Sequence, residues 1–218
     1  MATVELFRMI VQHTDSPNDQ GHARILIDNN TKIPDRTACV LKGSRAPIHE
    51  IKRSADGLIR LGADFLLIPC NTSHLFFDEI QSLISVEIVN MIAETALETK
   101  RQGIRTVGLL ATAVTTAGGV YQHFLEEQGI RVICPDPDQQ RVVMDFIYSG
   151  VKASNDRYNT RAFCDVVQSL MDQGAERIIL GCTEIPVGMK MYGLDFPFID
   201  SLEVLAKTAI LKAGYRYR

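Results

Sequence analysis

The sequence has 218 residues, of which 46% are hydrophobic, and its 23 Lys and Arg against 26 Asp and Glu give a formal charge of -3. That near-balance, without a long basic run, offers no electrostatic basis for binding nucleic acid or an anionic membrane. The apolar runs are too short for a membrane span of about 20 residues. The charged first residues do not resemble a secretory signal, so we expect a cytoplasmic protein.

Short β-branched runs alternate with helical patterns along the chain, which predicts an α/β fold with parallel sheets. Apolar residues spaced by three and four predict helices at 3–13, 44–61, 92–101, 119–128, 160–173 and 202–212. The predicted strands are 24–28, 64–69, 86–89, 106–111, 131–134, 177–181 and 196–199. Helix ends with left-handed caps favour glycine, and such ends are predicted at Gly62, Gly103, Gly129 and Gly174.

Two segments of the chain repeat one another. GADFLLIPCNT begins at Gly62 and GAERIILGCT begins at Gly174, and in both the glycine precedes a cysteine by eight residues. The chain therefore looks like a duplication, with a first domain at 1–100, joined by the C-terminal helix 201–218, and a second domain at 101–200. Each half would place a thiol, Cys70 or Cys182, at the end of a parallel strand, where open α/β sheets bind ligands.

The repeat also predicts a strand ahead of the first helix. The second half opens with the strand 106–111, so by the same register the first half should open with a strand before helix 3–13. Here the sequence opens on that helix. We therefore expect either a short N-terminal truncation or a lineage that lacks the strand.

Two thiols on opposite faces of a carbon acid could remove a proton from one side and return it from the other. Asn-Thr-Ser-His follows Cys70 and Thr-Glu follows Cys182, so each thiol is expected at a helix N-terminus, which favours a thiolate. A zinc site using Cys70, His74 and Cys182 is the weaker alternative, because no paired Cys/His motif occurs. No nucleophile elbow or phosphate loop is present, so cofactor-free chemistry fits best. The other cysteines, which lack such a setting, are assigned to packing: Cys39, Cys134 and Cys164.

The segments IPCNTSH, ending at His74, and LGCTEI, ending at Ile185, resemble the two catalytic motifs of the aspartate/glutamate racemase superfamily. Glu184 stands where glutamate racemases typically carry His, and the stretches 28–36 and 148–152 also resemble the aspartate racemase branch. The resemblance runs over essentially the whole chain. It departs at the N-terminus, where the strand and glycine-rich loop usual in the family are absent before Ala2.

This resemblance implies two similar α/β domains with the active site at their interface, no pyridoxal phosphate or metal, and a homodimer. It implies interconversion of L- and D-aspartate, with glutamate as a secondary substrate, by Cys70 and Cys182 as the acid/base pair. The implied substrate-binding residues are Arg36, Asn71, Thr72, Lys152 and Thr183. The implied supporting residues are His74, Glu184 and Asn30.

Four other functions stay open at this point. Within the superfamily, the reaction could resemble that of maleate isomerase, with Cys70 as a nucleophile, or that of hydantoin racemase. From a different class, the chain could be a dicarboxylate-binding protein without activity. It could also be a thiol redox protein in which Cys70 and Cys182 oxidise to a disulfide.

Overall fold

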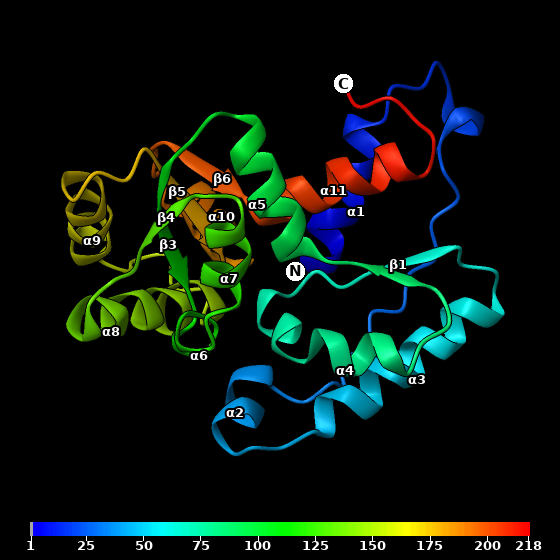
Figure 1. Ribbon diagram of the computed structural model, residues 1–218, viewed down its shortest axis with the longest axis horizontal. Coiled ribbons are helices and arrows are strands. Elements are labelled where there is room, and N and C mark those ends of the chain that lie inside the picture. Colours follow the sequence, from blue (N-terminus) through cyan, green and yellow to red (C-terminus); the bar gives the residue numbers. More distant parts are fainter. Residues whose placement is uncertain (1) are drawn as a thin grey trace. The chain divides into compact units, whose positions relative to one another are not determined.

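The structure is a computed structural model that describes residues 2–218, and these residues form two compact units (Figure 1). The first unit contains the described residues up to Glu94 together with Leu202–Arg218, and the second contains Thr95–Ser201. Each unit combines parallel strands with flanking helices, which confirms the predicted α/β class.

The second unit is built on a four-stranded parallel sheet with the order β4-β3-β5-β6. Its strands are β3 (Thr106–Ala111), β4 (Arg131–Ile133), β5 (Arg177–Gly181) and β6 (Phe198–Asp200). β5 pairs with both β3 and β6, and its Ile178, Ile179 and Leu180 are fully buried. A strand buried on both faces needs a continuous apolar run, which is what the sequence provides here.

Helices of the second unit flank this sheet and connect its strands. They are α6 (Ala113–Ala117), α7 (Val120–Glu127), α8 (Pro137–Asp145), α9 (Arg161–Asp172) and α10 (Glu184–Tyr192). A π-helix, η3 (Phe146–Lys152), follows α8 directly. The start of α8 is fixed by a capping box, in which Asp136 and Gln139 each bond the other's backbone N–H. Neither α8 nor η3 was among the helices predicted from spacing.

The first unit has a smaller sheet, in which β1 (Phe65–Leu67) pairs in parallel with β2 (Glu87–Val89). Its helices are α1 (Ala2–His13), η1 (Asp19–Gly21), α2 (Arg36–Leu41), α3 (Ala46–Arg60), η2 (Asn71–Phe76), α4 (Phe77–Ser82) and α11 (Ser201–Lys212). Helix α5 (Met91–Arg101) begins in the first unit and ends in the second. The hydrophobic sides of α1 and α11 pack together, so the C-terminal segment completes the core of the first unit.

The predicted strand at 24–28 is wrong, because this segment lies outside regular secondary structure. In the second unit β3 lies between β4 and β5, whereas among residues 2–218 β1 pairs only with β2. An apolar segment becomes a strand only when a neighbour supplies its ladder hydrogen bonds, and 24–28 has no such neighbour.

The short helices α2 and α6 were also not predicted, whereas the boundaries of the other predicted elements agree closely with the sequence patterns. The predicted helices lie within two residues of those observed, and the ends of the other predicted strands coincide with those observed or lie within two residues of them. The four glycines expected to end helices all have positive φ, from 72° at Gly103 to 102° at Gly174. None of the helices in the described part of the chain combines the length and the apolar character that a bilayer crossing requires.

Helix α10 packs against η3 through a glycine. A Cβ atom on Gly188 would lie 2.5 Å from Cζ of Phe146 and 2.6 Å from Cγ2 of Val151, so no side chain fits there without displacing η3. In contrast, Gly57 in α3 has open space around its Cα.

These two helical glycines should therefore respond in opposite ways to alanine. Gly188→Ala should lower the free energy of unfolding by about 1–3 kcal/mol, because it overpacks the core. Gly57→Ala should raise it by up to about 1 kcal/mol, since alanine has the higher helix propensity. Urea unfolding of both variants tests this, and an unchanged midpoint for Gly188→Ala would contradict the packing described.

Candidate functional site

The first cysteine motif connects the end of β1 to the start of η2. Cys70 is the N-cap of η2, as expected, and its carbonyl accepts a hydrogen bond from Ser73 N–H at 3.2 Å. Cys70 itself is half-buried. The four residues after it are polar yet buried: Asn71, Thr72, Ser73 and His74. Four consecutive buried polar side chains are unusual outside a functional site, because each must be hydrogen-bonded.

His74 connects this motif to the next strand-helix junction. Its Nδ1 lies 3.0 Å from the carbonyl oxygen of Cys70, and its Nε2 accepts the N–H of Met91 at 3.2 Å. Burial lowers the pKa of His74 to about 4, so the imidazole is neutral and its proton is on Nδ1, where it is donated to Cys70. Both ring nitrogens are thereby used, which leaves His74 no lone pair for the zinc site considered above.

Arg36 and Asn30 lie on the segment that leads into α2. Arg36 is the first residue of α2, and its Nη1 donates to the carbonyl of Pro34 at 3.2 Å. Asn30 donates to Ser54 Oγ at 3.0 Å, which ties this segment to α3. Helix α2 packs against η2, so the predicted cation and the first thiol belong to neighbouring elements of one unit.

In the second unit, Cys182 comes directly after β5 and just before α10. The residue is buried, with 6% of its surface exposed. Its Sγ donates to Oε2 of Glu184 at 3.0 Å, and the hydroxyl of Thr183 lies 3.4 Å from the same oxygen. Because a carboxylate can only accept in this contact, the thiol is the donor.

Lys152 is the last residue of η3, and η3 packs against α10. Its Nζ lies 4.0 Å from the centre of the Tyr148 ring, within the range of a cation–π contact. In both units the helix that follows the thiol thus packs against a segment that carries one of the two predicted cations.

The predicted site residues therefore fall into two groups, one per unit. The first half-site consists of Asn30, Arg36, Cys70, Asn71, Thr72 and His74, and the second of Lys152, Cys182, Thr183 and Glu184. All five cysteines are free thiols. Within the described residues 2–218, no three His, Cys, Asp or Glu side chains are grouped so as to hold a metal ion.

The sequence patterns missed a buried polar cluster beside the second half-site. Tyr121 is fully buried and hydrogen-bonds the side chains of Ser201 and Thr95, and its burial raises the pKa of the phenol. Asp200 is also buried. It pairs in the strand register with Leu180, which precedes Cys182 by two residues. The repeat offered a signal for Asp200, because it aligns with Asn90 at the equivalent strand end.

Comparison with known proteins gives a consistent result. The family profile described as Asp/Glu/Hydantoin racemase matches residues 1–209. The broad specificity amino-acid racemase RacX of Bacillus subtilis (strain 168) is 32% identical over 165 residues, which are 74% of this chain and 71% of that protein.

Solved structures also match the chain over nearly its whole length. The Picrophilus torridus aspartate racemase superimposes with a TM-score of 0.87 at 32% identity, covering 100% of this chain and 91% of that one. A candidate Asp/Glu racemase from Yersinia pestis gives a TM-score of 0.82 at 28% identity, covering 98% and 94%.

The neutral His74 predicts a specific loss of stability in acid. The pKa is about 6.5 in the unfolded chain and about 4 in the fold, so below pH 6.5 the unfolded state binds a proton that the folded state does not. Stability is therefore lost as the pH falls from 6.5 to 4, by an amount on the order of 3 kcal/mol. Urea unfolding between pH 7.5 and 4.5 should show a shallower decline for His74→Gln than for the wild type, and parallel declines would contradict the assignment.

Proposed function

We propose that this chain, which belongs to the Asp/Glu/Hydantoin racemase family, interconverts L- and D-aspartate by a two-base mechanism. The observation that carries the proposal is the pair of half-sites, each with a thiol just beyond a parallel strand and a cation on the adjoining segment. The likeness to an aspartate racemase and to a broad specificity amino-acid racemase supports the same reaction class.

The proposed roles of the two thiols follow from their surroundings. In one direction the Cys70 thiolate removes the α-proton of the substrate, and the Cys182 thiol donates a proton to the opposite face. In the reverse direction the Cys182 thiolate left by that step is the base and the Cys70 thiol is the donor, while Glu184 lies 3.0 Å from Sγ of Cys182 and can orient it. No redox step or electron acceptor is needed, since only protons move.

The cations suit a substrate with two carboxylates. Arg36 can bind a carboxylate through its planar fork, and Lys152 supplies a compact positive charge for the second carboxylate. Asn71, Thr72 and Thr183 would bind the α-carboxylate and amino group of the substrate. The proposal includes a cytoplasmic homodimer that acts without pyridoxal phosphate or metal, with glutamate as a secondary substrate.

Removing either thiol should abolish racemisation. Cys70→Ser and Cys182→Ser should each lower kcat by at least about a hundredfold, because a hydroxyl is too weak an acid to replace a thiol. Chiral chromatography of aspartate incubations measures this. The matched control is Cys164→Ser, an exposed cysteine on α9 that should leave kcat unchanged. Near-normal turnover by either site variant would contradict the two-base mechanism.

Substrate recognition is tested at Arg36. Arg36→Ala should raise KM for aspartate by at least about tenfold, because a charge-assisted bidentate contact is lost. Its melting temperature should change little, and the control Arg53→Ala, an exposed arginine paired with Glu50 on α3, should leave KM unaltered. An unchanged KM for Arg36→Ala would remove Arg36 from the binding site.

A further inference from the structure

The segment that carries Lys152 has an uncommon backbone conformation. Helix α8 runs directly into η3, a π-helix of seven residues that ends at Lys152. π-Helical turns are rare and are often found at functional sites, because they cost backbone stability and must be held by their surroundings. What holds η3 therefore also determines where the Lys152 side chain begins.

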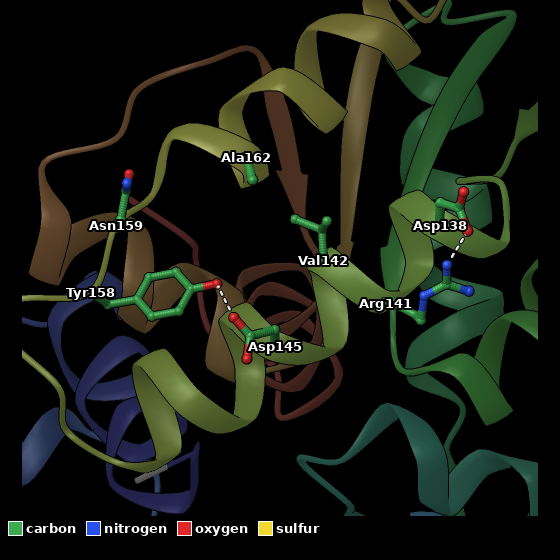
Figure 2. Close-up of a pocket in the computed structure, with 7 residues that line it drawn as sticks. All are labelled: Asp138, Arg141, Val142, Asp145, Tyr158, Asn159 and Ala162. Atoms are coloured by element: carbon green, nitrogen blue, oxygen red, sulfur yellow. Dashed lines mark hydrogen bonds and ion pairs between the residues drawn. The ribbon is translucent and has the colours of Figure 1, made fainter.

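Hydrogen bonds to Asp145 fasten the start of η3. Asp145, the residue just before η3, accepts a hydrogen bond from the hydroxyl of Tyr158 at 2.8 Å. The side chains of Ser149 and Tyr158 together keep the pKa of Asp145 below its usual range, so the group is a carboxylate. Figure 2 shows the Tyr158 hydroxyl directed at Asp145, where both residues line a shallow depression of about 450 Å³.

The ring of Tyr158 also packs against the middle of η3. A Cβ atom on Gly150 would lie only 3.1 Å from Cγ of Tyr158, so the ring lies directly on the glycine backbone. The same ring meets Phe146 edge to face, with 5.9 Å between the ring centres. Tyr158 thus contacts this segment at Asp145, Phe146 and Gly150, which spans most of the turn before Lys152.

At the C-terminal end of η3, the ammonium group of Lys152 contacts the ring of Tyr148. Nζ of Lys152 lies 4.0 Å from the centre of the Tyr148 ring, and both residues belong to η3. The contact spans four residues of η3, so the backbone conformation of η3 sets where the ammonium group lies. An exposed cation–π contact of this kind shifts an equilibrium by a factor of about two to five.

We propose that Tyr158 and Asp145 are positioning residues for the side-chain carboxylate of the substrate. Their hydrogen bond fixes η3, and η3 fixes the ammonium group of Lys152 over Tyr148. The inference rests on the proposed function, in which Lys152 supplies a positive charge for the substrate, and it assigns that charge to the side-chain carboxylate. The hydrogen bond between Tyr158 and Asp145 would thus affect substrate affinity, although neither Cys70 nor Cys182 lines the depression that these two residues share.

The variant Tyr158→Phe tests this because it removes the hydroxyl and keeps the ring on Gly150. KM for aspartate should rise threefold or more while kcat changes less than twofold. The matched control is Tyr217→Phe, because Tyr217 also donates its hydroxyl to a carboxylate, that of Glu203, and both residues belong to the first unit. The control should leave KM unchanged. Equal KM values for Tyr158→Phe and the wild type would overturn the inference.

A second comparison separates positioning of Lys152 from a general effect on the fold. In a Lys152→Ala background, Tyr158→Phe should raise KM no further, because the group that it positions is already gone. A further threefold rise in that background would overturn the proposed route through Lys152.

A measurement that does not need turnover separates this inference from the proposed function. The protein is treated with a limiting amount of an amine-reactive acylating reagent. Mass spectrometry then measures the acylation rate of the exposed Lys152 relative to that of the exposed Lys42. Tyr158→Phe should change the rate at Lys152 twofold or more and leave Lys42 unaltered. That result supports the inference even if the wild type does not racemise aspartate, whereas unchanged acylation at Lys152 overturns it even if the wild type does.

Discussion

Parallel strand pairing is the constraint on which the two half-sites depend. Strands that run in the same direction end at the same edge of a sheet, so the residues that follow them are brought together there. β1 pairs with β2 and leads to Cys70, while β5 lies between β3 and β6 and leads to Cys182. Each thiol is then followed by a helix that packs on a segment with one cation, Arg36 or Lys152.

The two thiols have different immediate surroundings although they occupy equivalent places in the repeat. The loop of Cys70 is held by a neutral imidazole, because His74 bonds the Cys70 carbonyl on one side and the Met91 amide on the other. The Cys182 thiol instead donates to the carboxylate of Glu184. A two-base racemase must hold one cysteine as a thiolate and the other as a thiol at any moment, and this asymmetry suits that need.

Features that depend on local pattern could be predicted from the sequence, and those that depend on distant partners could not. The buried run of β5 and the glycine ends at Gly62 and Gly174 follow from residue types alone. The segment 24–28 has a strand-like pattern but no ladder neighbour, so its prediction failed. The π-helical turn before Lys152 was missed because it depends on Tyr158 and Gly188, which contact it only in the folded chain.

The most direct test of the two-base account is the fate of solvent deuterium. The purified chain is incubated with L-aspartate in D₂O without added cofactor, and both enantiomers are separated at early times and analysed by mass spectrometry. Two thiols on opposite faces predict deuterium at Cα in newly formed D-aspartate and almost none in the remaining L-aspartate. Deuterium that appears in L-aspartate as fast as in D-aspartate, or D-aspartate that keeps the original proton, would contradict the account.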